Sequence, residues 1–176
     1  MVMSFNKRGI WKYLPEFVYG GIDGSVTTFA VVAGAIGASF STAVILILGF
    51  ANLFADGVSM ALSNYDSNKS DRELHSRTKF EKTSTKSALA TFFSFLVVGF
   101  LPLLFFVLAM FFPTLIKNAF LFSTILTALA FLFVGSVRGI VTGKHPIQSA
   151  LETLFIGAIA SSLAFLVGYI LKNVIH

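Results

Sequence analysis

Asp56 and Met60 lie one helical turn apart in the stretch ANLFADGVSMALSNY (residues 51–65), which follows a long apolar run. On a helix, Asn52, Asp56 and Met60 would share one face, with Ser59 beside them. Carboxylate oxygens alone suit Mg²⁺, Ca²⁺ or Mn²⁺, whereas a methionine thioether adds a softer donor that favours a late first-row ion such as Fe²⁺. The spacing indicates a cation site, although a buried methionine more often only fills a core.

Charged residues are few within the apolar stretches. The acids are Asp23, Asp56 and Glu152, and no Lys or Arg occurs between residues 17 and 65. An ionised carboxylate inside a membrane costs on the order of a few kcal/mol unless it is compensated. The compensation could be a proton, a bound cation, or a pairing with Arg138 across the bundle.

The elements that carry these residues follow from the composition. The 176 residues are 56% hydrophobic and 12% charged, with a mean hydropathy of +0.84, and about twice that charged fraction is usual in a soluble domain. The apolar residues come in blocks long enough to cross a bilayer, which predicts an all-α membrane protein with one domain over 1–176. We expect five transmembrane helices, at about 17–38, 42–64, 88–112, 119–140 and 150–171. The absence of Cys excludes disulfides and thiolate metal sites.

The distribution of basic residues predicts the orientation. Eleven of the 13 Lys and Arg residues lie in the N-terminal arm, in the loop over 65–87 and around the connection after the fourth span. Only Lys117 and Lys172 lie on the opposite side. Because basic residues concentrate in cytoplasmic loops, we expect a cytoplasmic N-terminus and an outside C-terminus. The net charge of +5 therefore reports topology and not a nucleic-acid partner.

With this orientation, the candidate ligands lie at similar depths. Asp23 lies about 9 Å along the first span, and Asp56 and Met60 lie about 12 Å and 6 Å from the cytoplasmic end of the second, at 1.5 Å per residue. Glu152 enters the same layer from the last span. We therefore expect these residues to share one layer, nearer the cytoplasmic face.

Small residues recur every four positions in the first span. Its glycines include Gly20, Gly24, Gly34 and Gly37, and three rows can be drawn: Gly20 and Gly24; Ala30, Gly34 and Ala38; Ala33 and Gly37. Such rows allow helices to approach closely. The partner could be a helix of the same bundle or the first span of a second subunit, which would bring two Asp23 side chains to a shared axis. The sequence leaves both open.

Four stretches together resemble the vacuolar iron transporter family: GGIDGSVTTFAVVAGAIGAS, ILGFANLFADGVSMALSNY, FLFVGSVRGIVTG and SALETLFIGAIASSLAFLVGYIL. The resemblance covers nearly the whole chain in order. It implies a homodimeric, proton-coupled exporter of Fe²⁺, often also of Mn²⁺, from the cytosol to a vacuole or the cell exterior. It also implies a pathway along the dimer interface between first and second spans, with Asp23 and Met60 as metal ligands.

The sequence departs from the family pattern in two respects. Asn52 replaces a Glu of well-known members, and Ser63-Asn64-Tyr65 stands where many have Gly-Glu-Tyr, so the site is less acidic. The glutamate-rich helical domain between the second and third spans is reduced here to about twenty residues. Within that loop, Ser70 and Glu73 fit a capping box, which predicts a headgroup-facing helix that extends the third span.

Two readings of function follow. In the first, Asp23 and Asp56 bind a dehydrated Fe²⁺ or Mn²⁺ ion, with Met60 adding selectivity, and protons release it; Glu152 either assists transport or forms a structural ion pair with Arg138. In the alternative, the chain is a non-transporting scaffold or partner subunit whose acids hold helices together. An enzyme is not expected, because no His cluster, activated Ser or Cys, or phosphate-binding loop occurs.

The remaining expectations concern surroundings. We expect no cofactor beyond the metal as substrate; the partners are metal ions, protons, lipid and a second copy of the chain, not nucleic acid. A multi-pass protein of this kind would lie in the plasma (inner) membrane of a bacterium or the vacuolar membrane of a eukaryote.

Overall fold

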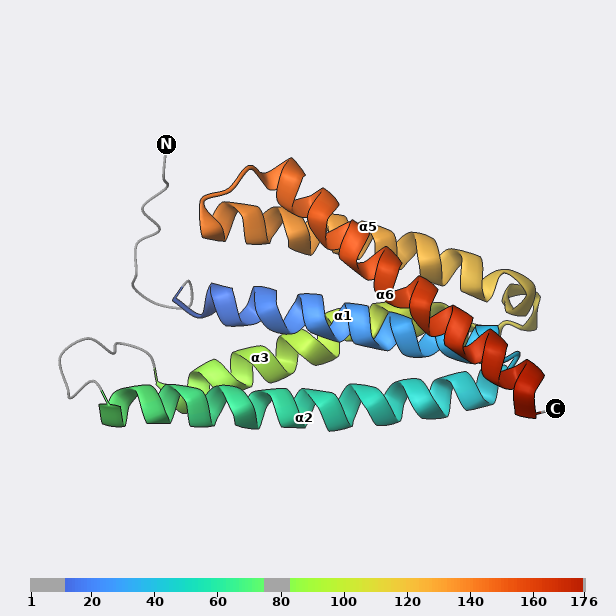
Figure 1. Cartoon of the computed structure of the whole chain (residues 1–176), viewed down its shortest axis with the longest axis horizontal. Coiled ribbons are helices and arrows are strands. Elements are labelled where there is room, and N and C mark those ends of the chain that lie inside the picture. Colours follow the sequence, from blue (N-terminus) through green and yellow to red (C-terminus); the bar gives the residue numbers. More distant parts are fainter. Residues whose placement is uncertain (1–11, 75–82, 176) are drawn as a thin grey trace.

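The computed structural model describes residues 12–74 and 83–175, and every regular element within them is a helix. Figure 1 shows their arrangement. In chain order they are α1 (Leu14–Gly37), α2 (Thr42–Leu74), α3 (Ser84–Gly99), α4 (Leu101–Phe111), the 3₁₀ helix η2 (Pro113–Asn118), α5 (Ala119–Thr142) and α6 (Pro146–Ile175). The prediction of an all-α chain is confirmed.

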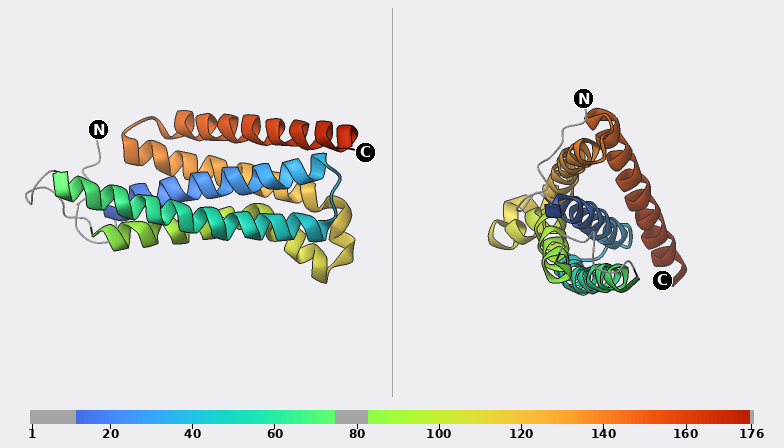
Figure 2. Two further views of the ribbon diagram at one scale, coloured as in Figure 1. Left: turned by 60° about the horizontal axis from the view of Figure 1, so that its bottom comes forward. Right: turned by 90° about the vertical axis from the view of Figure 1, so that its left-hand side faces the viewer.

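The helix α1 lies in the middle of the bundle, with α2 and α3 along one side and α5 and α6 along the other (Figure 2). Within its most apolar 18 residues, 56% are buried, against 11% in α6. The abundance of Gly, Ala, Ser and Thr in α1 explains this, because small side chains let four neighbours approach one helix.

The side chains are distributed as in a membrane protein. Large apolar residues face outward, such as Ile47 (68% exposed) and Phe133 (70%), while small hydroxyl residues such as Ser25, Thr91 and Thr127 are fully buried. A water-soluble protein shows the opposite tendency. Four described helices are long and apolar enough to cross a membrane, or five spans if α3 and α4 are counted as one. The chain is thus an all-α membrane protein, and the orientation of its termini stays a prediction.

The third span differs from the expected continuous helix over 88–112. The structure has two helices there, α3 and α4, which meet at Phe100 with a bend of 49° between their axes. Pro102 explains the break, because it has no N–H with which to continue the helical ladder. Its carbonyl oxygen accepts a hydrogen bond of 2.6 Å from Ser123 Oγ of α5, which holds the bent arrangement.

The second helix is longer than expected, and the capping box predicted at Ser70 is wrong. Ser70 lies inside α2, which continues to Leu74 because no Gly or Pro follows Gly57 to end it. Its 33 residues span about 50 Å at 1.5 Å per residue, whereas a bilayer core is about 30 Å thick. The polar extension therefore belongs to the second span. The rest of the predicted loop helix, over 75–82, lies outside the described residues.

Candidate functional site

The first helix sets the position of Asp23 through the glycines beside it. A Cβ atom added at Gly24 would lie 2.5 Å from the carbonyl oxygen of Phe95, and one at Gly20 the same distance from that of Thr91, so α1 and α3 are in backbone contact. This contact fixes the rotation of α1 about its axis. Asp23 is half-buried on a neighbouring face, and its carbonyl oxygen accepts a 2.8 Å hydrogen bond from Thr27 Oγ1.

The two predicted aspartates lie on neighbouring helices, Asp23 on α1 and Asp56 on α2, and both are half-buried. The negative charge of Asp56 acts on the Asp23 carboxyl group. Two ionised carboxylates whose charges act on one another repel, and a cation between them removes the repulsion. The pair is therefore suited to a dication.

The α2 face that carries Asp56 supplies three further side chains. Asn52 is half-buried, and its Nδ2 atom is buried without a hydrogen bond within the described structure. Because no hydrogen bond holds this nitrogen, the amide can turn to offer its oxygen to a cation. Met60 is half-buried and packs against the apolar cluster that contains Leu53 and Phe95, whereas Ser59 is exposed. Packing alone accounts for a methionine at position 60; it does not account for an acid at 56.

A cavity of about 370 Å³ lies between α1 and α5, and Asp23 is one of its lining residues. Two of its lining residues are charged, Asp23 and Arg138. The others are Pro15, Val18, Tyr19, Ile22, Val141 and Thr142. Asp23 therefore lies between Asp56 on one side and a space shared with an arginine on the other.

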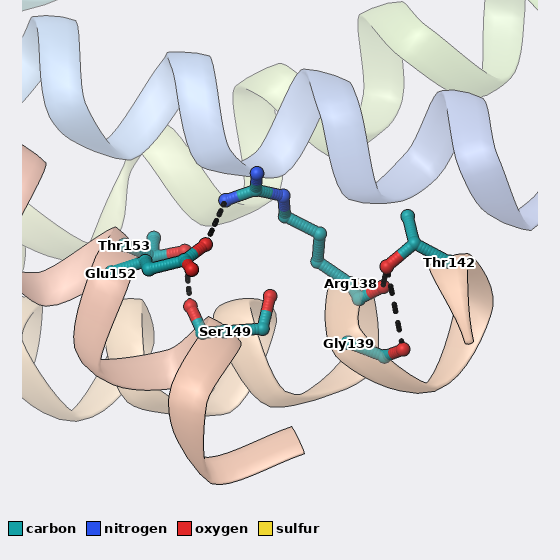
Figure 3. Close-up of polar contacts among 6 residues, drawn as sticks. All are labelled: Arg138, Gly139, Thr142, Ser149, Glu152 and Thr153. Carbon is teal, nitrogen blue, oxygen red and sulfur yellow. Dashed lines mark hydrogen bonds and ion pairs between the residues drawn. The ribbon is translucent and has the colours of Figure 1, made fainter. Parts of the chain in front are cut away.

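Glu152 lies beside Arg138 instead of joining the two aspartates. Glu152 Oε2 is 3.9 Å from Arg138 Nη1, and the two side chains are 37% and 32% exposed (Figure 3). Among the described residues, no three His, Cys, Asp or Glu side chains come together as a possible metal site. The expected layer of acids is thus divided into an Asp–Asp pair and an Arg–Glu pair.

Sequence reasoning missed one buried acid, Glu16 in the first turn of α1. Its Oε1 accepts a 3.0 Å hydrogen bond from Ser87 Oγ of α3, which in turn accepts one of 3.2 Å from Asn68 Nδ2 of α2. This polar chain joins three helices at the end of the bundle that the basic residues predict to be cytoplasmic. The hydropathy boundary at residue 17 excluded Glu16, but Pro15 directly before it is a helix-start signal that could have included it.

The four predicted packing glycines of α1 all face helices of the same chain. Gly20 and Gly24 meet α3, and Gly34 and Gly37 meet α6, where added Cβ atoms would lie 3.3 and 2.2 Å from carbonyl oxygens. One row of small residues has a second environment. Ala30, Gly34 and Ala38 also line an apolar groove of about 620 Å³ between α1, α6 and the start of α2.

Comparison with known proteins relates this arrangement to a family. Residues 14–83 and 73–169 match the model of the VIT family. The chain is 28% identical to the vacuolar iron transporter of Centaurea cyanus over 85% of this chain and 84% of that protein. It is 26% identical to vacuolar iron transporter 1 of Arabidopsis thaliana, over 90% and 86% respectively, and 25% identical to the vacuolar iron transporter of Plasmodium falciparum, over 91% and 82%.

These alignments are longer than the chain itself. The Arabidopsis alignment spans 218 positions although the chain has 176 residues, so that relative contains residues that this chain lacks. The two matched parts of the family model meet at residues 73–83, between α2 and α3. This connection is where the sequence predicts that the helical domain of the family is reduced.

Proposed function

The chain belongs to the VIT family, and on this premise we propose that it transports a divalent transition-metal ion, Fe²⁺ first and Mn²⁺ second, across a membrane. The observation that supports the proposal is the pair of half-buried aspartates on the neighbouring helices α1 and α2, Asp23 and Asp56, since the charge of Asp56 acts on Asp23. Three relatives that align with most of the chain are named vacuolar iron transporters.

The transport step uses the charges of this pair. Two ionised carboxylates match the charge of a dehydrated dication, so the ion binds without leaving net charge between α1 and α2. Asn52 contributes an oxygen and Met60 a sulfur from the same face of α2, which favours Fe²⁺ over harder ions. Protons arriving from the opposite side neutralise the carboxylates and release the ion, which makes the protein a metal–proton antiporter that exports metal from the cytosol.

The short α2–α3 connection bears on how metal reaches the site. The two matched parts of the family model overlap at residues 73–83, and here α2 ends at Leu74 and α3 begins at Ser84. We propose that the chain takes metal directly from the cytosol without a separate collecting domain. With fewer acidic residues available to collect metal on the cytosolic side, transport should need a higher free metal concentration.

The proposed functional unit is a homodimer. The apolar groove that Ala30, Gly34 and Ala38 line runs along the outer half of α1, between α6 and α2. Rows of small residues are typical of transmembrane helix interfaces. A second copy seated along this groove would place its own α1 and α2 opposite the first, with the two Asp23 side chains near a shared axis.

The test is uptake of Fe²⁺ and Mn²⁺ into proteoliposomes, with and without an imposed proton gradient. We expect gradient-dependent uptake by the wild type, reduced about tenfold or more in Asp23→Asn, since even groups that only support metal ligands are worth that much. Asp66→Asn makes the same chemical change at an exposed position on the extension of α2 and should transport normally. A folded wild type that moves neither ion, or an Asp23→Asn variant with normal uptake, contradicts the proposal.

A further inference from the structure

The ion pair between Arg138 and Glu152 connects two different cavities. Arg138 lines the cavity of about 370 Å³ that Asp23 also lines, whereas Glu152 lines a separate one of about 840 Å³ along α6. Figure 3 shows the guanidinium group extending away from α5 toward α1, with Glu152 at its side. The arginine is therefore placed between two acids on different helices.

Its contact with Glu152 is a loose one. The distance of 3.9 Å between Nη1 and Oε2 exceeds that of a hydrogen bond, and about a third of each side chain is exposed. An arginine fixed in a structural role usually makes two parallel hydrogen bonds to its carboxylate. Nothing in this geometry holds the guanidinium group to Glu152 alone.

Asp23 is a second possible partner for the Arg138 side chain. Without metal, Asp23 carries a negative charge that Asp56 adds to, and the permanently charged guanidinium group of Arg138 lines the same cavity as Asp23. Opposite charges that share a cavity away from bulk water attract each other. A bound dication cancels those charges and repels the guanidinium group. Glu152 is then the carboxylate that remains for it.

We propose that Arg138 is a mobile counter-ion, which pairs with Asp23 when the site is empty and with Glu152 when the site holds metal. The inference rests on the proposed transport function and adds a positioning residue to it. Arg138 competes with metal for Asp23, and Glu152 sets the strength of that competition by offering the alternative partner.

This arrangement predicts opposite effects from the two neutral substitutions. Arg138→Gln removes the competitor, so the KM for Mn²⁺ uptake should fall about three- to tenfold, because a larger fraction of molecules is ready to bind. Glu152→Gln removes the alternative partner, so the arginine stays on Asp23 and KM should rise by a similar factor. Arg138→Lys keeps the charge and should leave KM close to that of the wild type.

The double variant tests whether Glu152 acts through Arg138. With no arginine to attract, Glu152→Gln should add nothing to Arg138→Gln, and the double variant should have the low KM of Arg138→Gln alone. Lys144→Gln and Glu73→Gln make the same charge changes at exposed positions and should leave KM unchanged. Mn²⁺ binding to each purified variant, measured by the loss of the free-ion EPR signal, should follow the same order.

Two results would overturn the inference while leaving the proposed function intact. In one, both single substitutions shift KM in the same direction; in the other, the double variant lies midway between them, as expected of independent effects. A wild type that neither binds nor transports Mn²⁺ or Fe²⁺ overturns the proposed function and this inference together. If Asp23→Asn loses metal binding while Arg138→Gln keeps it, the proposed metal site stands, and only the KM values of the arginine and glutamate variants then decide the inference.

Discussion

Met60 can be read in two ways, and the structure gives a means to separate them. Its side chain packs on the apolar cluster around Leu53 and Phe95, and it also shares a face of α2 with Asp56. Packing depends on volume and shape, whereas a ligand role depends on the sulfur atom. A substitution that keeps the volume and removes the sulfur therefore distinguishes the two.

We expect Met60→Leu to fold normally, because volume-conserving swaps usually cost less than about 1.5 kcal/mol. Uptake of Fe²⁺ should weaken more than uptake of Mn²⁺; a loss of about 1 kcal/mol in Fe²⁺ binding is a roughly fivefold rise in KM. The measurement is the ratio of the two KM values in proteoliposomes, with Met60→Ala showing the added effect of lost packing. An unchanged ratio in Met60→Leu would assign Met60 to the core alone.

At the residue scale, the sequence supplies depth along each span. Counting residues along two antiparallel spans predicts Asp23 and Asp56 in one layer, and in the structure the charge of Asp56 acts on Asp23. The same counting placed Glu152 in that layer but left open whether it assists transport or pairs with Arg138, because depth does not fix rotation about a helix axis; in the structure it lies beside Arg138. Glu16 was missed because a hydropathy boundary does not report an acid that is buried next to another helix, here beside Ser87 of α3.

Among the helices, the contact between α1 and α3 has the strictest geometry. At Gly24 and Gly20, any side chain would collide with a carbonyl oxygen of α3, and a backbone cannot turn aside as a side chain can. Asp23 directly precedes Gly24, so a shift of α1 moves the candidate site. The spacing of the small residues is thus part of how the site is positioned.

We expect Gly24→Ala to destabilise the protein by about 1–3 kcal/mol or more, because overpacking forces the helices apart. Metal uptake should fall further than the amount of folded protein, since Asp23 moves relative to Asp56. Gly57→Ala is the milder comparison: its Cβ would lie 3.3 Å from a ring atom of Phe95, whereas at Gly24 the Cβ would lie 2.5 Å from a backbone oxygen. Thermal unfolding in detergent and uptake per folded molecule are the measurements, and equal behaviour of the two variants would contradict this account.

The bend between α3 and α4 offers a second test of helix geometry. Ser123→Ala removes the hydroxyl that donates to the Pro102 carbonyl, at a cost of about 1 kcal/mol for one hydrogen bond. We expect a lower unfolding temperature and faster amide exchange in α4, with little change in α1. Equal protection of α4 in wild type and variant, measured by hydrogen–deuterium exchange, would show that Pro102 alone holds the bend.

Helix boundaries were predictable where breakers mark them. The end of α5 follows from Gly143, whose φ of 73° lies in the left-handed region, and the break at Pro102 was readable although a continuous span was drawn through it. The extension of α2 to Leu74 was not, because polar residues such as Asp66 and Ser70 end an apolar run without ending a helix. Hydropathy reports where a lipid boundary lies, and helix-breaking residues report where a helix ends.

The molecule as a whole was predictable in class but not in arrangement. Composition and apolar blocks are sufficient for a helical membrane protein, since each span must satisfy its own backbone hydrogen bonds. They do not say which helix lies in the centre. That place belongs to α1 because its small residues meet α3 at Gly24 and α6 at Gly37, and such a choice depends on side-chain fit among all the spans together.

The orientation can be tested by labelling single introduced cysteines, because the chain has no cysteine of its own that would react with the label. In right-side-out vesicles, a single cysteine at Lys117 in η2 should react with a membrane-impermeant maleimide, and one at Asp66 on the α2 extension should react only after permeabilisation. The physical reason is the concentration of basic residues on the side of Asp66. The reverse labelling pattern would invert the topology and the direction of transport.

The central, well-buried position of α1 also has a consequence for biogenesis. This helix carries two acids and is the least apolar of the four long spans, so it partitions into lipid weakly by itself. It leaves the ribosome before α3 and α6, the helices that bury it. Its stable insertion must therefore wait for later parts of the chain, and the translocation machinery has to shelter it until they arrive. Truncations that end before α6 should leave α1 open to extraction and degradation.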